Sequence, residues 1–291
     1  EVYEDYGEDG EPNTQDEGEN NGQWDSTETV IRDLDGDTFY DPPEKQMEGS
    51  YALGNREGLW TNWYINGMRK EESNYLSGKL NGTIIRWHEN GNKSEEGVYE
   101  TGKQNGTWVW YYETGIKKEQ TRFLDGQQNG LWIQWFSDGA KKSERKFSSG
   151  ERDSVWTSWF DNGNKKFQAT YKNGKLNGGW TSWYEGGIVK EKSGAYSNNK
   201  LDNKWTYWAD DGRKTEEITY SNGIKNGSYV FWNFDNYKTL SGEYLNGVKH
   251  GLWTLWYDDG IIKAEENYSN GEMDGLWSWW RPDGIKDQEG N

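Results

Sequence analysis

The strongest constraint on this chain is an internal period of 24 residues, marked by tryptophan. The motif W-x-x-W or a near variant begins at eight tryptophans, and Ile84 and Tyr229 occupy the two remaining places in the series. The eight are Trp60, Trp108, Trp132, Trp156, Trp180, Trp205, Trp253 and Trp277. Successive copies start 24 residues apart, except that the step from Trp180 to Trp205 is 25. Ten copies in register predict a repeat architecture in which neighbours stabilise one another.

Each copy has the pattern of one β-hairpin. A turn such as Asn105-Gly106 precedes an aromatic run, and a second turn precedes a charged run that ends in Tyr or Phe. Asn-Gly and Asp-Gly pairs favour type I′ turns, because both residues accept a positive φ. The second turn has such a pair at Asn66-Gly67, Asn90-Gly91, Asp138-Gly139, Asn162-Gly163, Asp211-Gly212 and Asp259-Gly260. The sequence therefore predicts an all-β fold of about ten consecutive antiparallel hairpins.

Apolar burial in this chain must rest on aromatic rings. Only 31% of residues are hydrophobic and mean hydropathy is -1.23, which is typical of disorder, but aromatic residues make up 16% of the chain. In the strand WTSWF, Trp156 and Trp159 point to opposite faces, because side chains alternate along a strand. Both faces of an elongated, single-layer sheet are therefore expected to carry aromatic rings.

The unit from Gly174 to Tyr196, GKLNGGWTSWYEGGIVKEKSGAY, resembles the MORN-type repeat. It is similar to the variant N-G-x-W-x-x-W-Y-x-N-G-x-K-K-x-E-x-x-Y, often labelled a YwqK-like antitoxin repeat. The resemblance covers roughly Gly49 to Asn291. It implies consecutive hairpins in a curved single-layer sheet, with roles in binding, scaffolding or dimerisation.

Residues 1–48 differ from the repeats in charge. They hold 17 Asp and Glu against Arg32 and Lys45, a net of -15, whereas residues 49–291 hold 33 against 31, a net of -2. We therefore expect two parts, an acidic head at 1–48 and a ten-copy array at 49–291. Such a chain is a poor partner for nucleic acid or an anionic membrane, and no run is apolar enough to insert into one.

The acidic head contains a candidate calcium site, DLDGDTFYDPPE. Calcium takes six to eight oxygen ligands, and the stretch resembles an EF-hand loop in its carboxylates: Asp33, Asp35, Asp37, Asp41 and Glu44. It departs from that loop because Thr38 replaces the turn glycine and Pro42-Pro43 disfavours an exiting helix. Further candidate ligands without fixed spacing are Asp5, Asp9, Asp16, Glu19, Asn20 and Asp25. The sequence predicts a calcium-binding head, with a disordered acidic tail as the alternative.

Catalytic chemistry has little support. The chain has no Cys, which excludes disulfides, thiolate nucleophiles and Cys–zinc sites. His88 and His250 lie more than six repeats apart and each replaces an ordinary repeat residue, which favours structural roles. Carboxylate pairs such as Glu71-Glu72 recur with the period, whereas an active site is normally assembled once. We expect a protein that is not an enzyme.

The expected location is outside the cell or on its surface. The chain begins at Glu1 without Met, so it is either a fragment or a mature form from which a signal peptide has been removed. With an acidic, calcium-like segment at the start, the mature secreted form is expected.

Three functions of different classes fit these features. The first is a structural or interaction protein of the cell exterior, the second a glycan- or cell-wall-binding module, and the third a cytoplasmic antitoxin-like binding protein. Exposure of the tryptophans discriminates the first two, because a buried indole offers no platform for a sugar ring.

Head-to-tail assembly is expected from the two ends of the array. The last copy stops before its closing aromatic, so Trp277, Trp279 and Trp280 should lack a covering neighbour. The head has apolar residues that could complete this hairpin in another copy: Val30, Ile31, Phe39 and Tyr40. Open edges pair with other chains, and contacts between unlike surfaces build open polymers. We therefore expect a homopolymeric filament or surface layer in which residues 1–48 contact the region after Gly271 of the next copy.

Overall fold

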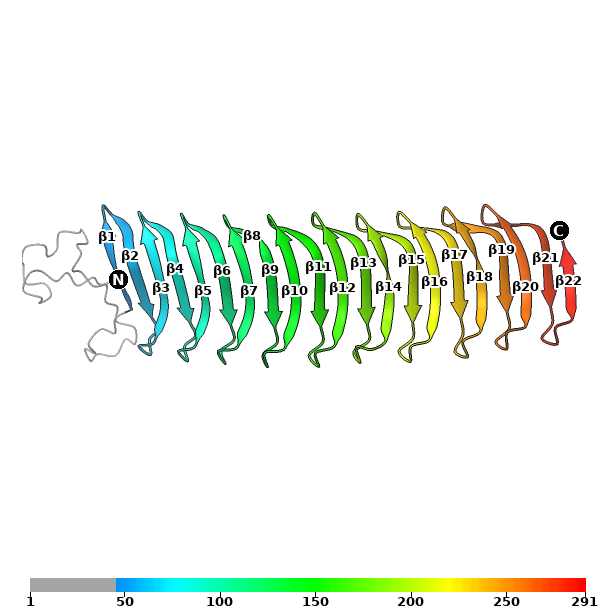
Figure 1. Cartoon of the computed structure of the whole chain (residues 1–291), viewed down its shortest axis with the longest axis horizontal. Coiled ribbons are helices and arrows are strands. Elements are labelled where there is room, and N and C mark those ends of the chain that lie inside the picture. Colours follow the sequence, from blue (N-terminus) through cyan, green and yellow to red (C-terminus); the bar gives the residue numbers. More distant parts are fainter. Residues whose placement is uncertain (1–45) are drawn as a thin grey trace, which may run out of the picture. The chain divides into compact units, whose positions relative to one another are not determined.

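The computed structural model describes residues 46–291, which contain 22 β-strands and no helix (Figure 1). Two compact units divide between Ala140 and Lys141. The first unit contains β1 (Met47–Ala52), β2 (Asn55–Trp63), β3 (Arg69–Leu76), β4 (Lys79–Trp87), β5 (Lys93–Glu100), β6 (Lys103–Tyr111), β7 (Lys117–Leu124), β8 (Gln127–Gln128) and β9 (Gly130–Trp135). The second contains β10 (Lys141–Ser148), β11 (Glu151–Trp159), β12 (Lys165–Lys172), β13 (Lys175–Trp183), β14 (Lys190–Ser197), β15 (Lys200–Trp208), β16 (Lys214–Ser221), β17 (Ile224–Trp232), β18 (Lys238–Leu245), β19 (Val248–Trp256), β20 (Ile262–Ser269), β21 (Glu272–Trp280) and β22 (Lys286–Gly290).

The prediction of consecutive antiparallel hairpins is confirmed within each unit. Each copy supplies two strands, as β6 and β7 do, and each strand pairs antiparallel with the next along the chain. The count exceeds twenty because β1 precedes the first copy and Asn129 divides the first strand of another copy into β8 and β9. The described array thus begins at Met47.

The predicted type I′ turns are at the other end of the hairpins. At Asn66-Gly67 only Gly67 has a positive φ, of 76°, and the connection between β2 and β3 spans five residues, closed by Tyr64 N–H donating to the Met68 carbonyl at 2.8 Å. Two-residue turns with both φ values positive instead join each copy to the next, as at Thr101 (50°) and Gly102 (82°). A type I′ turn needs this geometry. The chain therefore has the predicted turn type, but the prediction of its position was wrong.

The first predicted turn, Asn105-Gly106, is a bulge inside β6. Gly106 has a φ of 69°, and the register between β5 and β6 shifts between Glu96 and Val98. The equivalent residue has a positive φ in all ten copies, and in two of them it is Ser154 or Asn203 rather than glycine. The bulge bends each strand once, and therefore repeats with the 24-residue period.

The two faces of the sheet are chemically different. One, here the Trp face, carries the first tryptophan of each copy, and Trp60, Trp108, Trp205 and Trp253 on it are 0–3% exposed. The other, here the Lys face, carries Trp159, Trp183, Trp208 and Trp232 beside lysines. A thin sheet therefore buries indoles on both sides, as the alternation in the sequence predicts.

Glycine on the preceding strand decides which tryptophans are fully buried. A Cβ added to Gly97 would lie 2.2 Å from the ring of Trp108, so the indole lies directly against a backbone without a side chain. In this position Trp108 meets Tyr99 edge to face at 5.0 Å, and its indole N–H donates to the Val98 carbonyl at 3.1 Å. The same Gly, Tyr and carbonyl arrangement surrounds Trp60, Trp205 and Trp253. Where Thr121 or Ala169 replaces the glycine, the next tryptophan is only half-buried.

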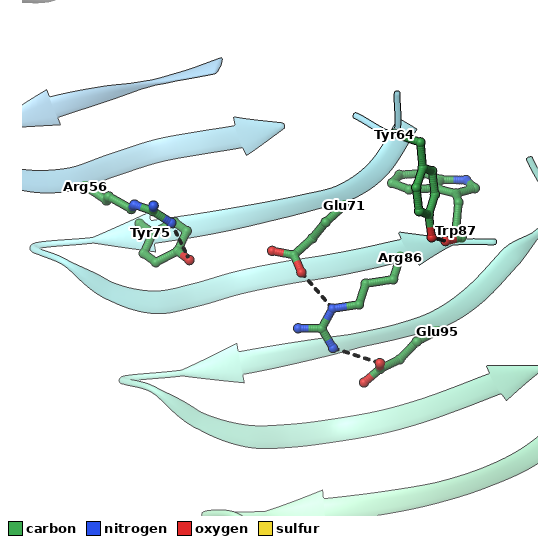
Figure 2. A network of polar contacts seen from close by, with 7 residues as sticks. All are labelled: Arg56, Tyr64, Glu71, Tyr75, Arg86, Trp87 and Glu95. Atoms are coloured by element: carbon green, nitrogen blue, oxygen red, sulfur yellow. Dashed lines mark hydrogen bonds and ion pairs between the residues drawn. The ribbon is translucent and has the colours of Figure 1, made fainter. Parts of the chain in front are cut away.

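Neighbouring copies are also tied together at the five-residue loops. The Tyr64 hydroxyl donates to the Trp87 carbonyl at 2.7 Å (Figure 2), and Tyr112, Tyr184 and Tyr257 repeat this bond in their copies. His88 occupies the same place, with Nε2 3.1 Å from the Tyr111 carbonyl oxygen. This position and bond agree with the structural role expected of His88.

Candidate functional site

The most distinctive surface of the second unit is a row of alternating lysines and tryptophans on its Lys face. Lys165 pairs with Trp159 in the β11–β12 register, and its ammonium lies 5.7 Å from the ring centroid of Trp183 on β13. Lys190 repeats the arrangement between Trp183 and Trp208, at 5.6 Å from the latter ring. Cation–π contact holds each ammonium over an indole while its outer side remains in solvent. We call this series the Lys–Trp row.

In the Lys–Trp row a carboxylate three residues later neutralises Lys141, Lys214 and Lys286, whereas Lys165, Lys190 and Lys238 have no such partner. Lys141 binds Glu144 at 2.7 Å and Lys214 binds Glu217 at 2.8 Å. Gln168 and Ser193 stand at the equivalent positions after Lys165 and Lys190, and neither lysine has an ion pair within residues 46–291. The middle of the row therefore carries positive charge that the described chain leaves unneutralised.

A second concentration of charge lies at the turn between β12 and β13. Lys172 and Lys175 are directly opposite in the antiparallel register, and both are exposed. Like charges opposite one another destabilise a sheet. The equivalent positions elsewhere in the described array hold no other like-charged pair; Glu100 faces Lys103, for example. This surface is therefore suited to an anionic partner.

Charge is unequally divided along the second unit. Residues 141–199 contain 11 Lys and Arg against six Asp and Glu, a net of +5. Residues 200–291 contain ten Lys and Arg against 16 Asp and Glu, a net of -6. The first half of this unit is thus the more favourable surface for an acidic ligand.

The charged residues on the Trp face of the first unit are internally satisfied. Arg86 donates to Glu71 at 2.7 Å and to Glu95 at 2.8 Å, joining three consecutive strands (Figure 2). Burial lowers the pKa of Arg86, but the hydrogen bonds to the two carboxylates outweigh it and raise the pKa overall. Nearby, Arg56 donates to the Tyr75 hydroxyl at 3.3 Å (Figure 2). This network connects hairpins and leaves no free nucleophile or base.

A tyrosine cluster on the Trp face of the second unit also serves packing. Burial, together with the charge of Glu216, raises the pKa of Tyr229 to about 12. Burial and the neighbouring Tyr220 likewise raise the pKa of Tyr207 to about 12. Raised values keep these hydroxyls neutral at physiological pH, so the cluster supports packing and offers no activated phenolate.

The sequence-predicted site residues have different outcomes. The calcium candidates Asp5, Asp9, Asp16, Glu19, Asp25, Asp33, Asp35, Asp37, Asp41 and Glu44, and the head residues Val30, Ile31, Phe39 and Tyr40, all lie outside the described residues. Trp277 and Trp280 are half-buried, because β22 pairs with β21 and Lys286 lies over the Trp280 ring at 5.3 Å. Trp279 is 41% exposed. No group of His, Asp or Glu in residues 46–291 could hold a metal ion.

The row of solvent-facing indoles that the glycan-binding alternative requires is not found within residues 46–291. Among the indoles of that part of the chain, only Trp279 is exposed. The others are half-buried or buried, and several lie beneath a lysine or arginine head group. The observation on which the glycan alternative depends is therefore missing there.

Sequence reasoning missed both the glycine rule and the Lys–Trp row. The signal for the first was a glycine 11 residues before a tryptophan, as at Gly242 and Trp253. The signal for the Lys–Trp row was the lysine that begins many charged runs. Its contact with an indole could not be predicted, because that contact depends on the strand register between copies.

Residues 46–291 contain no helix long and apolar enough to cross a membrane.

Comparison with known proteins agrees with the repeat geometry. No curated protein sequence matches the chain. A family described as the MORN repeat variant matches residues 104–125, 152–173 and 249–270. Each match runs from the early part of one copy's first strand, through the five-residue loop, to the turn after its second strand. The chain therefore carries MORN-variant repeats at these three positions.

Proposed function

We propose that this protein is a non-enzymatic interaction protein whose copies associate with one another. The supporting observation is a repeated hairpin sheet in which aromatic rings are used for packing while rows of polar and charged side chains face solvent. Proteins with MORN repeats are generally binding modules rather than enzymes. Fold alone does not assign a function, and the proposal therefore rests on the exposed Lys face.

The finer proposal is a structural role outside the cell, in a filament or surface layer. Acidic residues in 1–48 would bind calcium through carboxylate oxygens, with Asp33, Asp35, Asp37, Asp41 and Glu44 as the main ligands. Bound calcium would reduce repulsion among the 17 carboxylates of the head. Support comes from the ligand spacing in the sequence.

Charge argues against one part of the expected assembly. The region after Gly271 was expected to receive residues 1–48 of another copy, but residues 272–291 hold five Asp and Glu against Arg281 and Lys286. Two acidic surfaces repel one another at low ionic strength. Contact through the apolar rings of Trp277, Trp279 and Trp280 would have to overcome this repulsion.

Light scattering on the purified full chain tests self-association. We expect the mean mass to rise with concentration into the high micromolar range, in calcium and at physiological salt. A strictly monomeric species throughout that range, with and without calcium, would refute the proposal. The glycan-binding alternative requires a row of exposed indoles, and within residues 46–291 only Trp279 is exposed.

A further inference from the structure

We infer that the Lys face of β11–β14 is the docking site for the acidic N-terminal segment, residues 1–45, of a second copy of this chain. The inference rests on the proposed self-association and names its contact surfaces. The site consists of Lys165 and Lys190 in the Lys–Trp row and the pair Lys172 and Lys175 at the turn.

Charge complementarity is the first argument. Residues 1–45 carry 16 Asp and Glu against two basic residues, a net of -14, whereas residues 141–199 carry a net of +5. Elsewhere on the row, Glu144, Glu217 and Glu289 bind their lysines and would repel an acidic ligand. Lys238 has no ion pair within the described chain, but it lies in the half of the unit whose net charge is -6. Over β12–β14 those positions are Gln168 and Ser193, so carboxylates of a ligand meet ammonium groups that have no competing partner.

The geometry of the four lysines is the second argument. Lys165 and Lys172 mark opposite ends of β12, seven residues apart, which is about 23 Å along a strand. An acidic peptide lying along β12 and β13 would therefore meet charge at both ends of its path. It would also relieve the repulsion between Lys172 and Lys175, a pair that costs stability while it faces water alone.

The indoles of the row supply the third argument. The ring of Trp183 lies under the ammonium group of Lys165, and the ring of Trp208 lies under that of Lys190. These contacts hold both ammonium groups in place. A lysine fixed in this way loses less side-chain freedom when it binds a carboxylate than one that extends freely into water. The site is thus prepared for binding.

The occupant is the segment of a second copy, because a contact between copies is what the proposed self-association requires. Binding of the segment within its own chain is the alternative, and the cross-linking test distinguishes the two.

The absence of Cys from this chain provides a direct test by disulfide cross-linking. One variant carries Ser26→Cys in the acidic segment, and the other carries Gly179→Cys on the Lys face of β13, where an added Cβ meets nothing within 4 Å. The matched control is Ser228→Cys, an exposed residue at the same repeat position on β17, in the acidic half of the unit. All three variants are full-length chains.

We expect a mixture of the Ser26→Cys and Gly179→Cys chains to form a cross-linked dimer under mild oxidation, at several times the yield of the mixture with Ser228→Cys. The yield should fall in 0.5 M NaCl, where the Debye length is about 4 Å. Adding Lys165→Glu and Lys190→Glu to the Gly179→Cys chain should lower it about tenfold, whereas Lys238→Glu, in the same row without an ion pair, should not. Replacing the two charge reversals by Lys165→Gln and Lys190→Gln should give an intermediate yield. Because these substitutions remove charge without reversing it, this variant shows whether the lower yield comes from charge or from a folding defect.

Three results would overturn the inference: equal yields at Gly179→Cys and Ser228→Cys, no effect of the two charge reversals, or a disulfide that forms only within a chain carrying both Ser26→Cys and Gly179→Cys. Light scattering separates this failure from that of the proposed function. If the mass still rises with concentration in the Lys165→Glu, Lys190→Glu chain, self-association stands and this docking site does not.

Discussion

Gly242→Ala tests the central packing rule of this fold, that a glycine on one strand makes room for a tryptophan on the next. A Cβ at position 242 would lie 2.3 Å from Cδ2 of Trp253, whereas carbon atoms in contact are about 3.5–4.0 Å apart. The indole must therefore move by more than about 1 Å. Trp253 is 0% exposed, so no open space is available on its own face of the strand.

The magnitude follows from what the indole loses. A buried tryptophan removes about 150–250 Å² from water, which at about 25 cal/mol per Å² is about 4–6 kcal/mol for complete burial. A partial shift forfeits part of this, together with the 3.1 Å hydrogen bond from the Trp253 indole to the Glu243 carbonyl and the edge contact with Tyr244 at 5.1 Å. With the usual cost of overpacking of about 1–3 kcal/mol, we expect a loss of about 2–4 kcal/mol.

Gly179→Ala is the matched control, because Gly179 lies on β13 with an ordinary φ and its added Cβ meets nothing within 4 Å. Its effect should be within about 1 kcal/mol of zero. Urea unfolding gives the free energies, and hydrogen exchange over residues 238–256 locates the damage, since repeat arrays can unfold locally. Equal effects of the two substitutions would refute the rule, as would normal exchange protection of β18 and β19 in Gly242→Ala.

Three further predictions concern the bulge, the tyrosine cluster and the head. Ser154 has a φ of 62° at a position that is glycine in eight copies, so Ser154→Gly should raise the free energy of unfolding by about 1 kcal/mol, and Gly106→Ser should lower it similarly; a loss in Ser154→Gly would contradict this. The pKa values of Tyr207 and Tyr229, about 12 when folded against about 10 when unfolded, mean that the unfolded chain loses these protons first, so stability should be full below pH 10 and decline between pH 10 and 12. The decline measured by urea unfolding should be shallower in Tyr229→Phe, and an unchanged slope would count against the assignment. Chelation of calcium should increase protease cleavage within residues 1–48 while leaving β10–β22 protected, and cleavage independent of chelator would argue against a calcium-bound head.

The repeat and its secondary structure follow from the amino-acid sequence alone. A 24-residue period with alternating aromatic and polar residues suits only a strand pair repeated in register, and the hairpins between β1 and β22 follow from local pattern alone. The same reasoning predicted that Trp156 and Trp159 face opposite sides and that His88 substitutes for a ring in the repeat. These features depend on residues close together in one copy, where sequence patterns carry most information.

Only the tertiary structure reveals the turns, the burial of individual tryptophans and the contacts between lysines and indoles. Asn66-Gly67 did not form the predicted two-residue turn, because the register between β2 and β3 shifts beside Trp63 and lengthens the connection to five residues. Trp108 is buried because Gly97 lies beneath its ring, whereas Trp180 is only half-buried because Ala169 occupies the equivalent position. Gly97 and Ala169 lie on β5 and β12, the strands that pair with β6 and β13 from the preceding copy. Lys165 differs from Lys214 already in sequence, through Gln168 in place of Glu217, but the contact of each ammonium with an indole of the next copy appears only in the folded sheet. Each of these outcomes is set by distances across strands, which the order of residues within one copy does not contain.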